Sequence, residues 1–353
     1  MRASFGLILY INLRILTREI MDPLRTSIFA TILYYDSFNF PLSLAEVYRY
    51  LINPKRFSVQ RSDPKKEEMI NIEAAEIAVE LDKMAKAGLI GHKNGFYFMS
   101  GKDELYKRRI EKDKLANKKW KKFTAIVKYL QFAPYLRAVF ASGSLASNNP
   151  EMKSDFDVFV VIRSGRLYTG RLFLWLISSL LGARRGRFDV IAPDKLCFNH
   201  YVTDDNLEIH SRSLYVAQSL VNMKLVIFSN VVFEKLIVSN KWVNSYCRNF
   251  RRLSLYRNIK PNKIMLGLAG AGEALLNNFF GDILEKTLMA FQQKRIKKNP
   301  ATYESGGRII FTDKELEFHP RSFERVVIDN YNEGLKKFGV FGVEENNSGL
   351  TCG

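Results

Sequence analysis

Two aspartates and a glycine–serine pair are the residues of this chain whose types and spacing could do chemistry. Asp155 and Asp157 stand two apart at the head of the apolar run 158–162. On a β-strand both carboxylates would point to one face, and a hard cation such as Mg²⁺ relieves their repulsion while binding substrate phosphates. Gly143 and Ser144 follow another apolar stretch, where a glycine lets backbone N–H groups approach a phosphate. The pattern predicts a metal-dependent phosphate site.

This arrangement resembles the DNA polymerase β-like nucleotidyltransferase superfamily. The signature of that family is an apolar residue, Gly-Ser, a spacer of about ten residues and Asp-x-Asp on a strand, and the segment from Gly143 to Asp157 matches it. The resemblance implies two-metal chemistry, in which Asp155 and Asp157 hold Mg²⁺ or Mn²⁺ on a nucleoside triphosphate. It also implies that Gly143 and Ser144 grip the terminal phosphates.

The resemblance further implies a third carboxylate on a later strand, within an apolar-Asp-apolar-apolar run. Residues 187–193 have this form, so Asp189 is the predicted third metal ligand, which would also activate the incoming hydroxyl. Its rivals Asp194, Asp204 and Asp205 stand beside a proline or in a probable turn, and we interpret them as loop residues.

Two observations leave other interpretations of the Gly-Ser and Asp-x-Asp segment open. An Asp-x-Asp pair by itself also occurs at solvated strand ends and turn caps. Many members of the family carry an arginine after the Gly-Ser stretch, whereas Ser147 and Asn148 stand here. Phosphate contacts made by that arginine would have to come from another residue or be absent.

Arginines are concentrated on both sides of the predicted helix that follows the Asp-x-Asp strand. We assign Arg166 and Arg171, at the start of this helix, to nucleotide binding together with Ser154, since helix N-termini and arginines bind phosphates. The alternative is a rim that neutralises the acidic site. The whole group comprises Arg163, Arg166, Arg171, Arg184, Arg185 and Arg187.

The elements that position these residues begin with a unit at 24–100. Three helical patterns are followed by two short apolar runs around Asn94-Gly95, a strong hairpin signal. This order resembles a winged-helix domain, which would bind nucleic acid or, alternatively, another protein. The predicted recognition helix at 72–87 contains Glu73, Glu76 and Glu80, which repel phosphate and favour the protein alternative.

A basic connector at 101–132 leads to a catalytic domain at 133–206. The connector should be a helix whose interleaved charges form either a solvated face or a nucleic-acid contact, with Trp120 and Phe123 packed against the catalytic domain. In the strand at 196–202, Asn199 and His200 should point to opposite faces, and either could line the pocket.

The remainder is predicted to be a helical domain at 207–343, in which 299–320 looks extended, with an N-terminal extension at 1–23 and a disordered tail at 344–353. The expected fold class is α+β: a winged helix, a small mixed nucleotidyltransferase sheet with flanking helices, and a helical domain.

Composition sets the outer bounds. The 353 residues are 47% hydrophobic and carry a formal net charge of +18, which favours polyanionic partners such as nucleotides or nucleic acid. Three well-separated cysteines, Cys197, Cys247 and Cys352, indicate neither a disulfide framework nor a zinc cluster, so a reducing cytoplasm is expected. No apolar run is long enough to predict a membrane span.

The expected function is transfer of a nucleoside monophosphate from an NTP to an acceptor hydroxyl. The acceptor stays open among small molecules, RNA ends and proteins. One alternative is a winged-helix DNA-binding regulator whose transferase domain senses nucleotides, and another is a polynucleotide-directed transferase with a continuous basic groove.

Overall fold

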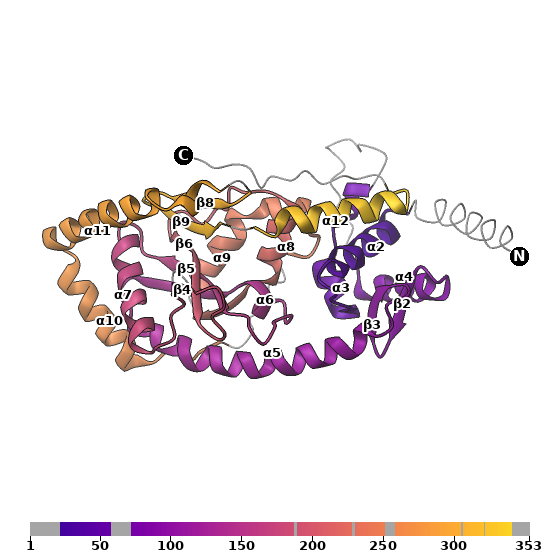
Figure 1. The fold of residues 1–353 in the computed structure, drawn as a ribbon, viewed down its shortest axis with the longest axis horizontal. Coiled ribbons are helices and arrows are strands. Elements are labelled where there is room, and N and C mark those ends of the chain that lie inside the picture. The colour runs from indigo at the N-terminus through magenta and orange to yellow at the C-terminus, as the bar shows by residue number, and fades with distance from the viewer. Residues whose placement is uncertain are drawn as a thin grey trace, which may run out of the picture.

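The computed structural model of the chain describes residues 22–57, 72–186, 189–227, 230–250, 258–304, 306–320 and 322–340. The fold is mixed α/β and contains two sheets in this part of the chain. Figure 1 shows an elongated arrangement, in which a small N-terminal unit and a larger sheet unit are bridged by α5 along one edge and by α12 along the other. The predicted tail at 344–353 and nearly all of the predicted N-terminal extension lie outside the described residues.

The N-terminal unit is built from short elements with strong local signals. Ser43 and Glu46 form a capping box at the start of α3. The turn between β2 and β3 contains Asn94 and Gly95, both with positive φ, which confirms the hairpin. Its three-stranded sheet has the order β1-β3-β2. The elements are α2 (Pro23–Asp36), β1 (Leu42–Ser43), α3 (Leu44–Tyr50), η1 (Pro54–Phe57), α4 (Ala74–Lys86), β2 (Ile90–Lys93) and β3 (Phe96–Met99).

The predicted basic connector is the helix α5 (Leu105–Val127), which continues into η2 (Lys128–Phe132). Trp120 and Phe123 are fully buried against the sheet unit, as expected. Arg109 is also buried and pairs with Glu46 of α3 at 2.7 Å. The helix therefore joins the two units through both apolar packing and buried ion pairs.

The larger sheet has six strands in the order β7-β4-β5-β6-β9-β8. β5 and β6 are parallel, and the helix α7 (Leu167–Leu180) connects them, whereas every other neighbouring pair is antiparallel. The strands are β4 (Leu136–Ala141), β5 (Phe156–Ile162), β6 (Leu196–Thr203), β7 (Lys224–Ile227), β8 (Arg308–Phe311) and β9 (Glu315–His319).

The prediction of a separate helical domain at 207–343 is wrong in its boundary. β7, β8 and β9 belong to this segment and complete the central sheet, so only the extended character of 299–320 was anticipated. The remaining helices are α6 (Gly143–Ala146), α8 (Leu214–Asn222), α9 (Asn230–Ser239), η3 (Lys241–Ser245), α10 (Lys263–Leu276), α11 (Phe279–Lys297), η5 (Pro300–Tyr303) and α12 (Glu324–Lys337).

Each face of the large sheet contributes to its own hydrophobic core. Alternate residues such as Phe159 and Val161 face a core shared with α2, α8 and α12, whereas Val158 and Val160 face a core with α5 and α7. The first core is continuous from the N-terminal unit to the sheet. The two units are therefore parts of one packed body.

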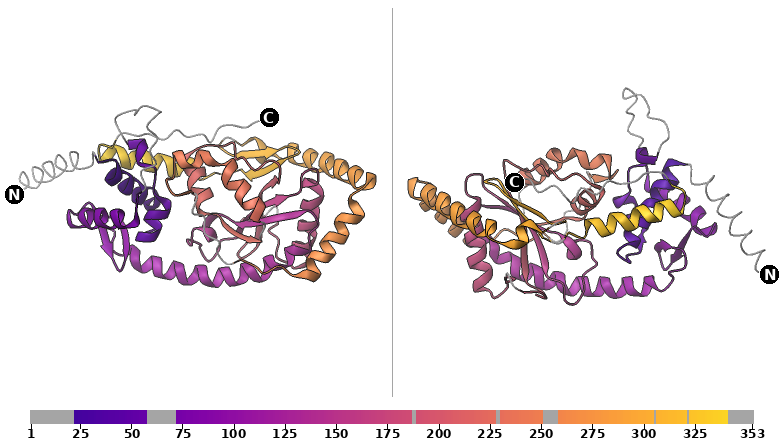
Figure 2. Two further views of the ribbon diagram at one scale, coloured as in Figure 1. Left: turned by 180° about the vertical axis from the view of Figure 1, so that it is seen from behind. Right: turned by 45° about the horizontal axis from the view of Figure 1, so that its top comes forward.

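The helix α12 returns from the sheet unit to the beginning of the chain. It lies beside α2 in both views of Figure 2. Phe29 meets Phe338 with ring centroids 4.8 Å apart, and Tyr34 meets Tyr331 at 6.0 Å. Gly334 passes so close to Leu33 that a Cβ would lie 2.7 Å from a leucine methyl carbon. Among the residues that the structure describes, no helix has the length and apolar character of a membrane span.

Candidate active site

The two aspartates lie at the amino end of β5. Asp155 directly precedes the strand and Asp157 is its second residue, so the two side chains share the face that continues with Phe159. The nearest oxygens of both carboxylates lie within 4.8 Å of each other and of the Cys197 sulfur. The sequence prediction that Asp155 and Asp157 converge is confirmed.

Gly143 places the chain directly against these carboxylates. Its φ of 60° is in the left-handed region, and a Cβ at this position would lie 2.1 Å from Oδ2 of Asp157. The backbone N–H of Ser142 donates to the carbonyl of Asp157 at 3.0 Å, which holds the turn against β5. Only glycine permits so close an approach, so the Gly-Ser turn and the aspartate pair form one site.

Three side chains surround the aspartates. The amide Nδ2 of Asn199 donates to Oδ1 of Asp157 at 2.8 Å. Nη1 of Arg185 donates to Oδ2 of Asp155 and lies 3.8 Å from the sulfur of Cys197. Cys197 is directly opposite Asp157 in the β5–β6 register.

The electrostatics of the site favour a bound cation. Burial, together with the neighbouring Asp155 carboxylate, raises the pKa of Asp157 to about 7, while Arg185 opposes the shift. Burial and the two carboxylates also raise the pKa of the Cys197 thiol to about 12. One arginine therefore compensates the negative charge only in part. The donor set of two carboxylates at one strand end fits a divalent ion such as Mg²⁺ or Mn²⁺.

Asp189 does not lie on a strand, so this prediction is wrong. Residues 189–193 form a loop, in which Val190 and Ile191 are 90% and 56% exposed instead of buried in a sheet. The carboxylate of Asp189 accepts from the backbone N–H of Gly186 at 2.7 Å and is not part of the cluster around Asp157. The next strand begins at Leu196, and its second residue, Cys197, lies beside the two aspartates. Arg187 and Phe188 lie outside the described residues.

The three rival aspartates lie in turns, as interpreted from the sequence. Asp194 pairs with Lys119 and Lys122 of α5 at 2.7 and 2.6 Å.

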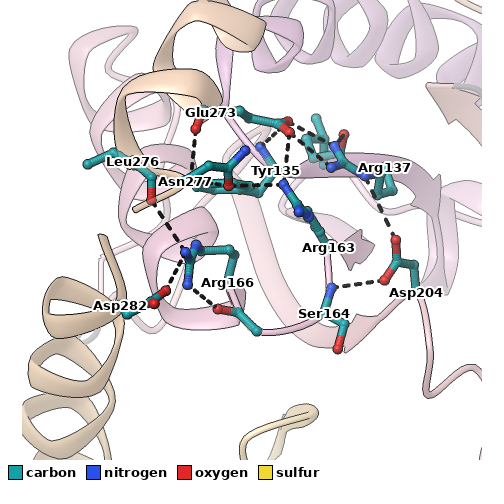
Figure 3. A network of polar contacts seen from close by, with 12 residues as sticks. Tyr135, Arg137, Arg163, Ser164, Arg166, Asp204, Glu273, Leu276, Asn277 and Asp282 are labelled. Carbon is teal, nitrogen blue, oxygen red and sulfur yellow. Dashed lines mark hydrogen bonds and ion pairs between the residues drawn. The ribbon is translucent and has the colours of Figure 1, made fainter. Parts of the chain in front are cut away.

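Arg166 and Arg171 lie away from the aspartates. Arg166 follows the carboxyl end of β5, about 20 Å along the strand from its amino end at about 3.3 Å per residue. Arg171 lies 5.5 Å from the ring centroid of Tyr201, on the face of the sheet opposite the aspartates. Figure 3 shows Arg166 donating to Asp282 at 2.5 Å and to the carbonyl of Leu276 at 3.3 Å. Arg171 donates to Gln292 at 2.8 Å. Both arginines thus attach α7 to the α10–α11 segment, and their predicted phosphate contacts are not supported by their positions.

Arg163 belongs to the same network, beside Glu273 and Asn277 (Figure 3). Among the described residues of the arginine group, Arg185 is the member that contacts one of the paired aspartates, as the alternative of a neutralising rim expects.

The two predicted serines differ in position. Ser144 is the second residue of α6, beside Gly143, and its carbonyl accepts from the backbone N–H of Asn149 at 2.9 Å. Its nucleotide-binding role stays a prediction. Ser154 instead stabilises the preceding turn, where its hydroxyl accepts from the backbone N–H of Glu151 at 2.9 Å and its carbonyl accepts from Lys119 at 2.8 Å.

A register shift explains why Asn199 reaches the site. Val158 pairs with Phe198 and Phe159 with His200, so Asn199 is an extra residue in β6. As a result Asn199 contacts Asp157 while the adjacent His200 packs edge-on against Phe159 at 4.8 Å, on the same face. The expectation of opposite faces is wrong, and no local sequence signal indicated the bulge.

Comparisons of the chain with family models, with curated proteins and with solved structures gave no match.

Proposed function

We propose that this protein is a nucleotidyltransferase that moves NMP from an NTP to an acceptor hydroxyl. The observation that carries the proposal is the close approach of Gly143 to Asp157, with Asp155 beside it. A glycine turn packed against paired carboxylates brings a phosphate-binding backbone and a metal-binding edge together. This is the arrangement that the resemblance to the polymerase β-like superfamily implies.

In this proposal the oxygens of Asp155 and Asp157 would hold Mg²⁺ or Mn²⁺, which would neutralise phosphate charge as pyrophosphate leaves. The Gly143–Ser144 turn would orient the terminal phosphates through its backbone N–H groups. The acceptor oxygen bonds to the α-phosphorus, the bond to the bridging oxygen of the β-phosphate breaks, and the hydroxyl proton passes to water. Arg185 supplies a positive charge beside Asp155 that can also meet a phosphate oxygen.

The N-terminal unit supports the winged-helix part of the proposal by its order of three helices and a hairpin with a third short strand. The outer side of its α4 exposes Glu73, Glu76 and Asp82, which repel a nucleic-acid backbone. Protein contact is therefore the favoured role of this unit.

A polynucleotide-directed transferase is less well supported. Arg109, Lys112 and Lys119 point from α5 into the molecule and pair with carboxylates. These three basic side chains of the connector are therefore paired within the protein and are not presented to a polynucleotide.

The nucleotide-sensing regulator is the second candidate, and one observation favours it. The position expected for a third carboxylate is taken by Cys197, whose protonated thiol cannot accept the proton of an incoming hydroxyl. A site with two carboxylates could bind a metal–nucleotide complex while transferring its NMP slowly.

The test uses NTPs labelled at the α-phosphate, with Mg²⁺ or Mn²⁺ and with cell lysate and total RNA as acceptors. Wild-type protein is compared with Asp155→Ala/Asp157→Ala and with Asp329→Ala, which removes an exposed carboxylate of α12. We expect label to enter protein, RNA or small molecules with wild type and Asp329→Ala alone. If wild-type protein binds NTP in a metal-dependent way but transfers no NMP, the nucleotide-sensing regulator becomes the better supported function. NMP transfer by the double variant would contradict the proposed site.

A further inference from the structure

The side chains of Asp155, Asp157 and Cys197 form a mixed oxygen and sulfur cluster at the amino end of β5. One potential ligand atom from each lies within 4.8 Å of the other two. β5 and β6 are parallel here and Cys197 is opposite Asp157, so the backbone of two paired strands fixes the three positions. Such rigid placement is what a metal centre requires.

A positively charged group already lies between the sulfur and one carboxylate. Nη1 of Arg185 contacts Oδ2 of Asp155 and lies 3.8 Å from the Cys197 sulfur. The backbone of Arg185 is held by a hydrogen bond to Leu196 of β6, but its side chain is 34% exposed and can turn toward solvent. A small cation could therefore take the place of the guanidinium group between the same two ligands.

We propose that Cys197 is the third protein ligand of this site and that it makes the site selective for a softer divalent ion, of the Zn²⁺ class, over Mg²⁺. The inference rests on the metal site of the proposed function. Binding exchanges one proton for one metal–sulfur bond: the thiol of Cys197 loses its proton to solvent and its sulfur binds the ion as a thiolate. Thiolates favour Zn²⁺ and Cd²⁺, whereas a site of carboxylates alone favours Mg²⁺.

The mixture of ligand atoms in the cluster is what would make the site selective. A divalent cation of the softer class would attract the thiolate and both carboxylates together, since all three ligand atoms lie within reach of one ion. A monovalent or strictly oxygen-seeking ion gains less from the sulfur.

The test is titration of the full-length protein with Cd²⁺, which gives a thiolate-to-metal absorption band in the ultraviolet, with excess Mg²⁺ present to occupy weak oxygen sites. Four proteins are compared: wild type, Cys197→Ser, Asp155→Ala/Asp157→Ala, and Cys247→Ser/Cys352→Ser as the matched thiol control. We expect one equivalent of Cd²⁺ to give the band in wild type and in the control, and the band to be lost in the other two. A wild type without the band, or a band that persists in Cys197→Ser or without the aspartates, would overturn the inference.

A second variant keeps the result interpretable if Cys197→Ser folds poorly. Cys197→Asp retains three ligands and should bind Mg²⁺ more tightly than wild type by calorimetry, without any sulfur band. Equal Mg²⁺ affinity in the two proteins would count against the sulfur ligand. Neither readout needs turnover: a Cd²⁺ site at Cys197 with no NMP transfer refutes only the transferase, and NMP transfer without the band refutes only the sulfur ligand.

Discussion

At the residue scale, Gly143 is a position that tolerates little change. An alanine there would place its Cβ 2.1 Å from Asp157 and would also occupy a positive φ. Gly165 has a φ of 72° and open space around the position that a Cβ would take, so Gly165→Ala isolates the cost of φ alone, about 1 kcal/mol. We expect Gly143→Ala to cost about 1–3 kcal/mol more than this control in urea unfolding, and to abolish NMP transfer. Equal losses in the two variants would mean that the turn can move away from Asp157.

Asp157 should make stability depend on pH. Its pKa is raised to about 7 in the folded protein, so the folded state binds a proton more tightly than the unfolded state. Its contribution is therefore fully present below the unfolded pKa of about 4 and is lost as the pH rises through about 7. In chelator, we expect the free energy of unfolding to fall by roughly 1–3 kcal/mol between about pH 5 and about pH 8 through this group.

Asp157→Asn is the matched variant, because its amide oxygen can still accept from Asn199 while it does not titrate. Urea unfolding at the two pH values should show a smaller decrease for Asp157→Asn than for wild type. A divalent ion that binds the site should also reduce the decrease in wild type. An identical pH dependence in both proteins would show that Asp157 ionises normally.

The sequence predicted the residues of this site that are close together along the chain. Gly143, Asp155 and Asp157 belong to one β-turn-β segment, so their spacing alone places them together. Arg185, Cys197 and Asn199 come to them through the crossover of α7 and the parallel register of β6, which no local pattern specifies. The apolar run around Asp189 imitates a strand, but Pro193 and its exposed side chains place it in a loop.

At the scale of elements, α5 depends on a buried charge. Arg109 is 5% exposed, pairs with Glu46 and Asp113, and lies 4.0 Å from the ring centroid of Phe40. Arg109→Ala would leave the carboxylate of Glu46, which is 16% exposed, without its positively charged partner, and we expect a loss of about 3 kcal/mol in urea unfolding. Lys114→Ala, an exposed position on the same helix, should change stability by less than about 0.5 kcal/mol. A similar small effect for Arg109→Ala would show that water reaches Glu46.

Local chemistry made several elements predictable. The Asn94-Gly95 turn and the end of the predicted helix 72–87 before Gly88 each depend on residues within a few positions of one another. β7 is different: its four residues follow α8 directly, and they form a strand because β4 offers an unpaired edge. Tertiary context decides such short strands, so 207–343 was predicted as a helical domain with an extended stretch at 299–320 and without β7.

At the scale of the whole molecule, α12 connects the last part of the chain to the first. Tyr331 is 1% exposed and packs against Tyr34 of α2. We expect Tyr331→Ala to cost about 3 kcal/mol and to increase hydrogen exchange in α2, some three hundred residues away in sequence. Arg325→Ala, on the exposed side of α12, is the control and should leave exchange in α2 unchanged.

Faster exchange confined to α12 in Tyr331→Ala would contradict this coupling. The domain order predicted from the sequence could not show it, because separate units were expected where one continuous core exists. Contacts between residues so distant in sequence leave no periodic pattern in either segment.

The return of α12 to α2 also makes the path of the backbone nearly circular, with Phe29 and Phe338 in contact. When the two ends of a chain lie close together, the same fold can form from a chain that starts at a different residue. A permuted gene that joins the present ends by a flexible linker and opens the chain at the Asn94-Gly95 turn should still encode the same fold. The order in which the segments are synthesised could thus be changed while the buried contacts of α5 and α12 are kept.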